Sequence, residues 1–198
     1  AYWYTVAESY MYMGWLLDKC NSSNGTAEAT ALVNTLVGVV GVDPSNVPAN
    51  MSASPQLVEG LLRIFFYPSV ISPSGPASYE EGFADMDKDL QLSDLGGTIL
   101  PNSGNGGVDS TVIYRLREGI ERFTTSNIND PGANNTSQSE IFVMWDSVST
   151  VASAFNHVPG GCNVLYMDGH CTFVRYTAKQ NAPVNEMFAL CSGLILGG

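Results

Sequence analysis

Charged residues are scarce in this sequence, and basic residues are the scarcest. Charged residues make up 14% of the 198 positions, whereas an ordinary soluble domain has roughly 25%. Eight lysines and arginines stand against 19 aspartates and glutamates, so the net charge is -11. This charge would repel a phosphate backbone or an anionic membrane surface. We therefore expect no nucleic-acid partner, and the surplus of carboxylates suits solubility or divalent cations.

The sequence also lacks long hydrophobic runs and zinc motifs. No apolar run reaches the ~18 residues of a membrane span, and no basic-then-apolar leader opens the chain. We therefore expect a chain that is soluble or already processed. The four cysteines have neither Cys-x-x-Cys nor zinc-type spacing. Buried thiols or disulfides remain, with the pairing open, and we expect no cofactor.

Histidine is rare, which limits the candidates for acid-base chemistry to His157, His170 and the Asp168 between them. Asp168 suits the first position of a type I′ turn. His157 precedes a bend at Gly160 and Gly161, where its imidazole would act as a local clasp. Nucleophile elbows, His-Glu-x-x-His pairs and phosphate-binding loops are absent from the sequence. We expect structural roles and no enzyme, with a secreted hydrolase using His157 and Asp168 as the alternative.

An acidic stretch resembles the start of an EF-hand loop. Asp85, Asp87 and Asp89 occupy relative positions 1, 3 and 5. Leu90 then stands where the loop needs glycine, and Gly96 stands where it needs a bidentate glutamate. The EF-hand interpretation therefore fails, and a calcium site of another kind stays open beside a solvated acidic loop.

Periodicity and turn signals predict one domain over 1–198 with mixed secondary structure. Residues 68–107, rich in proline and glycine, are expected to form a long irregular surface excursion. Residues 179–198 are expected to form an apolar C-terminal arm. The predicted elements are an aromatic strand in 1–17, helices over 26–40, 56–66 and 109–123, and a core strand over 140–145.

A β-hairpin is the sharpest local prediction. Two β-prone segments, 162–167 and 170–176, flank Asp168-Gly169, and Asp-Gly is a strong signal for a two-residue hairpin turn. A type I′ turn there would place Val164 opposite Phe173. The same register would leave Cys162 and Cys171 too far apart for a disulfide.

Five Asn-x-Ser/Thr sequons mark candidate glycosylation sites in turn-like contexts. They suggest a surface location, although an Asn- and Ser-rich chain produces some sequons by chance. The candidate asparagines are Asn21, Asn24, Asn50, Asn134 and Asn135.

Three segments together resemble the C-terminal half of a bacterial family of type IV pilin-like proteins. The segments are 109–123, 138–146 and 155–170, and the shared signature is a histidine, His157, followed by Asp168-Gly169. The resemblance implies a pilin-like α+β head whose helices pack on an antiparallel sheet. It also implies an apolar N-terminal helix with a prepilin cleavage site. The sequence given starts at Ala1 without such a helix, so either the helix was removed or this protein assembles in another way.

Without that helix, the chain ends are the expected contacts of a homopolymer. A terminal segment that completes a neighbour's sheet would form an open filament. We expect a secreted structural subunit of an extracellular filament or surface appendage; a module that binds glycans through exposed tyrosines and tryptophans is a further alternative. The candidate self-assembly residues are Tyr2, Trp3, Tyr4, Met187, Phe188, Leu190, Leu194, Ile195 and Leu196.

Overall fold

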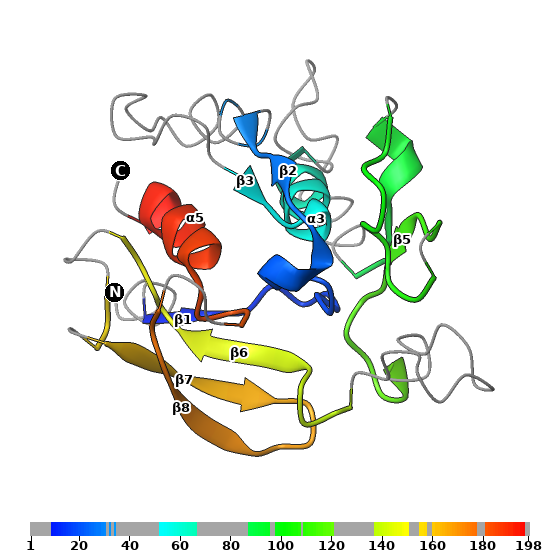
Figure 1. The fold of residues 1–198 in the computed structure, drawn as a ribbon. Helices are drawn as coiled ribbons and strands as arrows, with labels where there is room; N and C mark the ends of the chain where they lie inside the picture. Colours follow the sequence, from blue (N-terminus) through cyan, green and yellow to red (C-terminus); the bar gives the residue numbers. More distant parts are fainter. Residues whose placement is uncertain are drawn as a thin grey trace, which may run out of the picture.

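The fully described elements form a four-stranded antiparallel sheet, two α-helices and two smaller antiparallel ladders (Figure 1). This mixed architecture agrees with the predicted α+β class. The computed structural model describes residues 9–30, 32, 34, 52–66, 87–95, 98–107, 109–120, 137–150, 155–157, 160–177 and 181–196. Besides the elements introduced below, the described residues include two 3-10 helices, η1 at Ser22–Asn24 and η3 at Leu92–Leu95.

The main sheet has the strand order β1-β6-β7-β8. One row across it pairs Met11 with Trp145, Trp145 with Val164, and Val164 with Thr172. Trp145 and Val164 are fully buried, so this side of the sheet faces the core. The predicted core strand over 140–145 is confirmed as β6. The strand bounds are Tyr10–Met11 for β1, Phe142–Asp146 for β6, Gly161–Tyr166 for β7 and Cys171–Arg175 for β8.

The predicted hairpin is confirmed, but its turn and register differ. Tyr166 donates its N–H to the carbonyl of His170 at 3.0 Å, which makes a three-residue loop. Gly169 alone in that loop has a positive φ, 89°, so Asp168 is not left-handed and the type I′ assignment was wrong. A type I turn followed by a left-handed glycine is the usual three-residue solution. Val164 therefore faces Thr172 instead of Phe173.

Helix α3, Pro55–Phe66, confirms the helix predicted over 56–66. Proline at the first helical position needs no N–H partner, and Ser54 Oγ accepts the Leu57 N–H at 3.3 Å just before it. The chain enters α3 through the ladder of β2, Ala27–Glu28, with β3, Ser52–Ala53. The predicted helix over 26–40 was therefore wrong at its start, but the described residues Thr30, Leu32 and Asn34 are helical. The rest of the range lies outside the described residues.

The helix predicted over 109–123 was wrong where the structure describes it. Val112–Ile113 forms strand β5, which pairs with β4, Leu90–Gln91, and Arg115 bridges to Trp15. Ile113 is fully buried in this extended conformation. Its β-branched neighbour Val112 also fits a strand better than a helix. Tertiary pairing thus overrides an apolar spacing that helices and strands can both satisfy.

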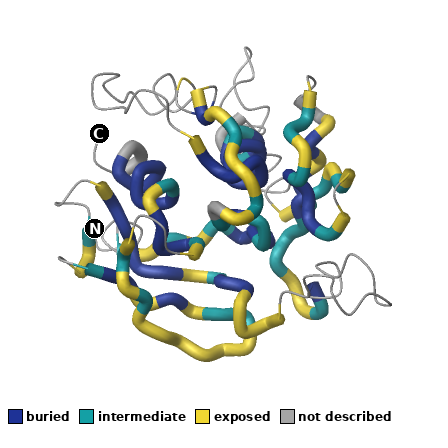
Figure 2. The backbone as a smooth tube through the Cα atoms, viewed as in Figure 1, coloured by how far each residue is buried: buried dark blue, intermediate teal, exposed yellow. Residues whose placement is uncertain are grey.

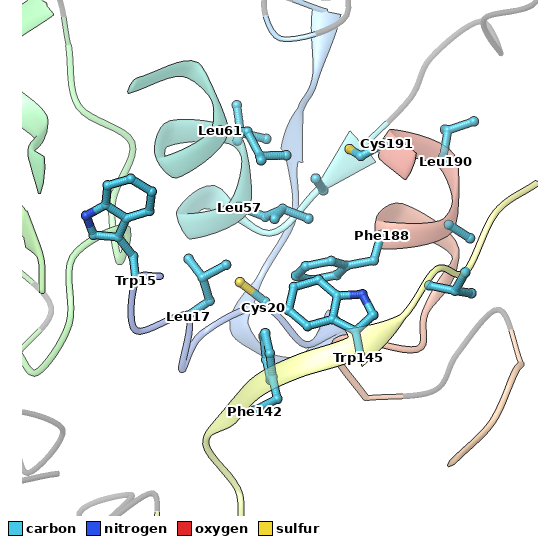
Figure 3. Close-up of a cluster of buried hydrophobic side chains, with 14 of the residues drawn as sticks. Trp15, Leu17, Cys20, Leu57, Leu61, Phe142, Trp145, Phe188, Leu190 and Cys191 are labelled. Atoms are coloured by element: carbon cyan, nitrogen blue, oxygen red, sulfur yellow. The ribbon is translucent and has the colours of Figure 1, made fainter. Parts of the chain in front are cut away.

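The C-terminal segment is a core helix and forms no free arm. Helix α5, Glu186–Leu196, buries Phe188 and Leu190 within the chain's own core (Figures 2 and 3). The Phe188 ring meets Trp145 and Phe142 of β6 edge to face, with centroids 5.5 and 5.7 Å away. The expectation of an apolar arm in 179–198 is therefore corrected for residues 186–193, because these side chains complete the core above the sheet.

Candidate functional site

The first site to consider joins His157 to Asp146 on the outward side of the sheet. His157 Nε2 lies 2.9 Å from Asp146 Oδ2, and the same oxygen accepts the Asn163 backbone N–H at 2.8 Å and Nδ2 at 2.9 Å. The strand register explains the cluster. Trp145 pairs with Val164, so the next residue of β6, Asp146, lies opposite the preceding residue of β7, Asn163. The Asp146 carboxylate is only 6% exposed and already has three donors. His157 is thus a clasp at the open end of the hairpin.

The second histidine belongs to the turn. Asp168 Oδ1 accepts the His170 N–H at 3.1 Å and lies 2.5 Å from His170 Nδ1. These hydrogen bonds, the backbone one first, lower the pKa of the Asp168 carboxyl. The His170 ring stacks on Tyr166 with centroids 4.5 Å apart, and burial raises the pKa of the Tyr166 hydroxyl. Asp168 therefore orders the loop.

The hydrolase alternative requires His157 beside Asp168, and the structure separates them. His157 lies before the start of β7 and Asp168 lies beyond its end. The His157 ring reaches along β7 as far as Asn163, since it contacts Asp146 and lies 6.4 Å from the Phe173 ring opposite Asn163. The three residues from Asn163 to Tyr166, at a rise of roughly 3.3 Å, still put about 10 Å of strand between the His157 ring and the turn that holds Asp168. Each histidine instead contacts a different carboxylate, so the pair cannot act as one acid-base unit.

Large apolar side chains are exposed on the sheet surface opposite the core. Tyr10, Met144, Leu165 and Phe173 are between 36% and 57% exposed. The pairing registers place all four on one side of the sheet, and we call this side the outer face. Polar Asp146 and Asn163 lie between Tyr10 and Phe173 in one row. The outer face is thus an apolar surface with a polar strip through its middle.

No family model, curated protein or solved structure matches this chain. Among the described residues, helices are too short or too polar to cross a bilayer.

Two acidic residues of the calcium candidate contact arginines. Asp89 Oδ1 accepts the Arg115 backbone N–H at 2.7 Å and pairs with Arg117 at 3.0 Å, while Asp87 lies 3.4 Å from Arg115 NH2. Asp85 lies outside the described residues. Within the described ranges, no three histidine, cysteine or acidic side chains converge as metal ligands. The calcium interpretation stays a prediction, and these carboxylates join the 87–89 segment to the arginines that follow β5.

All four cysteines are free, so the expected disulfides are not found. Cys20, Cys162 and Cys191 are buried, and Cys171 is exposed on β8. Burial raises the pKa of Cys162 and of Cys191 to about 12 and raises that of Cys20 as well. A raised thiol pKa means little thiolate at neutral pH. The three buried cysteines therefore behave as apolar core residues.

A buried polar network that our sequence reasoning missed anchors the chain between 98 and 107. Asp18 Oδ1 accepts hydrogen bonds from Asn105 Nδ2 at 2.6 Å and from Gln56 Nε2 at 2.9 Å. Lys19 Nζ donates to the carbonyls of Gly104 at 2.6 Å and Gly106 at 2.8 Å. Part of the predicted loose excursion is thus fixed to the core. Contacts across more than 80 positions leave no local signal in the sequence.

The remaining candidates are partly placed. Asn21 Oδ1 accepts the Ala182 N–H at 2.7 Å, and Asn24 Oδ1 accepts the Asn21 N–H at 3.0 Å. Both carbonyl oxygens therefore support the local fold, and glycosylation there stays a prediction. Met187 is partly buried against the core. Asn50, Asn134, Asn135, Tyr2, Trp3 and Tyr4 lie outside the described residues, as do the side chains of Leu194, Ile195 and Leu196.

Proposed function

We propose that this chain is the pilin-like head of a structural subunit that assembles with its own copies into an extracellular filament or surface appendage. The observation that carries the proposal is the outer face, where Phe173 is 57% and Tyr10 49% exposed. Several large apolar side chains exposed on one side of a sheet are a common mark of an interaction site. The resemblance carried by residues 155–170 supports the same interpretation.

The histidine-to-aspartate signature serves the scaffold in this proposal. His157 closes the open end of the hairpin on Asp146, and Asp168 orders the three-residue turn at the other end. A rigid hairpin holds Leu165 and Phe173 in a fixed arrangement on the outer face. This role needs no substrate, no metal ion and no cofactor.

The proposal places the subunit contact on the outer face instead of the C-terminal residues. Phe188 and Leu190 are 2% and 8% exposed because α5 is packed into the core. Removing residues 187–198 would therefore unfold the head as well as any filament. The outer face is a better target for mutation, since its side chains contribute little to the core.

The experiment compares purified wild-type chain with a Met144→Thr, Leu165→Thr double variant by negative-stain microscopy and pelleting. Both substitutions keep β-prone residues at exposed positions, so the unfolding midpoint should change little. Thr172→Ser on β8 is the matched control. We expect filaments from the wild type and the control, and far fewer from the double variant. Equal filament formation in all three would contradict the outer-face contact.

A glycan-binding module is the second candidate, and one observation favours it. Tyr10 and Phe173 lie at the two ends of a row across the sheet, with Asp146 and Asn163 between them. Aromatic rings beside planar polar groups suit sugar rings. Trp15 and Trp145 take no part, since they are 3% and 2% exposed. Titration with soluble saccharides, followed by NMR of the Tyr10 and Asn163 amides, tests this candidate; a Tyr10→Ala variant that binds equally well would contradict it.

A further inference from the structure

The two edges of the main sheet are unequal. β1 contributes only two residues at one edge, whereas β8 contributes five at the other. β8 pairs with β7 along its whole length without a register shift, and no other strand among the described residues pairs with its far side (Figure 1). A long, regular edge strand is a template for pairing with another chain.

The hydrogen-bond pattern shows which backbone groups of β8 point outward. His170 accepts the Tyr166 N–H at 3.0 Å, and Tyr176 donates to Gly160 O at 2.8 Å. His170 and Tyr176 therefore direct their backbone groups toward β7. Alternate residues of an antiparallel strand direct these groups to opposite sides. The N–H and C=O of Phe173, between them, consequently point away from β7.

β8 lacks the features by which proteins usually block an edge. Such edges carry proline, lysine, a bulge or a charge that points inward. The sequence of β8 is Cys-Thr-Phe-Val-Arg, which contains no proline or lysine, and its register is continuous. Phe173 at its centre is the most exposed large hydrophobic residue of the described chain.

We propose that β8 pairs antiparallel with β8 of a second copy of this chain, which joins the two sheets into one of eight strands. Charge favours this occupant and this orientation. β8 carries one charged side chain, Arg175 at its end, while Asp168 lies in the turn at its beginning. An antiparallel pair brings each Arg175 toward the partner's acidic turn, whereas a parallel pair would align like charges. Each copy has a net charge of -11, so two copies repel each other least when they meet through a strand without carboxylates. β8 is such a strand.

The contact is two-fold and self-complementary, so it closes at two copies. Phe173 of each copy would lie beside the other across the symmetry axis, where aromatic cross-strand pairs are favourable. A closed pair does not extend into a filament. This inference therefore stands apart from the proposed function, and each can fail without the other.

The test is sedimentation velocity of the full chain under reducing conditions, at concentrations where no polymer pellets. Reduction prevents cross-linking through the exposed Cys171. Phe173→Pro removes an N–H that points away from β7, so it should spare the hairpin. Phe173→Thr removes the ring and keeps the N–H. We expect a two-copy species for the wild type, and a dissociation constant raised roughly tenfold or more by Phe173→Pro, because two backbone hydrogen bonds are lost.

Phe173→Thr should weaken the pair less than Phe173→Pro does. A wild type that stays monomeric at high micromolar concentration would overturn the inference, as would a Phe173→Pro variant with unchanged affinity. If that variant unfolds, amide hydrogen exchange of the wild type decides the question. The Phe173 amide should become protected as concentration rises. An amide that exchanges equally fast at all concentrations would equally reject the pairing.

Discussion

Asp18 and Asn105 are joined by a hydrogen bond of 2.6 Å although 87 positions separate them in the sequence. Asn105 also donates to the carbonyl of Leu16 at 2.8 Å and accepts the Tyr114 N–H at 2.7 Å. One amide side chain thus ties three parts of the chain together, and it is 2% exposed. The fold depends on this buried connection as well as on its apolar core.

Asn105→Ala should destabilise the protein strongly. The substitution removes the hydrogen bonds of Asn105 to the buried Leu16 carbonyl, to Asp18 and to the partly buried Tyr114 N–H. A buried group that loses its hydrogen bond costs about 1–3 kcal/mol. Urea unfolding measures the loss. Thr111→Ala, at an exposed position nearby, is the control and should change stability by less than about 0.5 kcal/mol. Equal midpoints for the two variants would show that the network carries no stability.

Asp18→Asn should change how stability depends on pH. Burial is the main cause that raises the Asp18 pKa above its ordinary value of 3.8, while hydrogen bonds from Gln56 and Asn105 oppose it. Between pH 3.8 and the raised pKa of folded Asp18, the folded state keeps a proton that the unfolded state has released. The free energy of unfolding therefore falls as the pH rises through this window. Asparagine still accepts both hydrogen bonds and has no proton to lose.

The variant should gain stability relative to the wild type above that window, and the difference should vanish below pH 3.8. Urea unfolding of both proteins between pH 3 and pH 8 gives the comparison. A stability difference that does not vary with pH would contradict the buried, proton-retaining state of Asp18.

Asp146→Ala should cost more stability than His157→Ala. Asp146 Oδ2 accepts from Asn163 twice and from His157, so its removal takes one nearly buried acceptor away from three partly exposed donors. The expected loss is about 1–3 kcal/mol. His157 is 49% exposed, and its removal takes away one hydrogen bond, which contributes about 0.5–1.5 kcal/mol. Thermal unfolding ranks the variants, and a larger loss from His157→Ala would contradict the anchoring role of Asp146.

Gly161→Ala and Gly160→Ala form a matched pair within the glycine bend. A Cβ at Gly161 would lie 2.3 Å from the Val174 carbonyl oxygen and 2.7 Å from the Phe173 ring, whereas a Cβ at Gly160 meets nothing within 4 Å. Overpacking of this kind costs about 1–3 kcal/mol. Gly161→Ala should therefore lower the unfolding midpoint while Gly160→Ala leaves it nearly unchanged. The reverse order would contradict the close approach of β8 to Gly161.

Local signals predicted those elements whose neighbours are close in sequence. The apolar spacing over 56–66 predicted α3, and Asp168-Gly169 predicted the hairpin. The turn type was missed because Asp-Gly also suits a three-residue loop with the glycine alone left-handed. Because the loop has three residues instead of two, the register of β7 with β8 differs by one residue from the predicted register.

The elements that sequence reasoning missed depend on distant partners. Ile113 lies in a strand because Leu90 pairs with it and Trp15 bridges to Arg115 beside it. The contact of His157 with Asp146 follows from the pairing of β6 with β7, and no spacing in the sequence reveals it. The sequence identified His157 and His170 as candidates. The hydrolase alternative joined His157 to Asp168, whereas His157 contacts Asp146 and His170 contacts Asp168.

The central claim is that this chain is a self-assembling structural subunit. Negative-stain microscopy of the purified wild-type chain over a range of concentrations, with pelleting to quantify the polymer, tests it most directly. We predict filaments above a critical concentration, with a pelleted fraction that rises thereafter. Dispersed particles of one or two copies at every concentration would contradict the account.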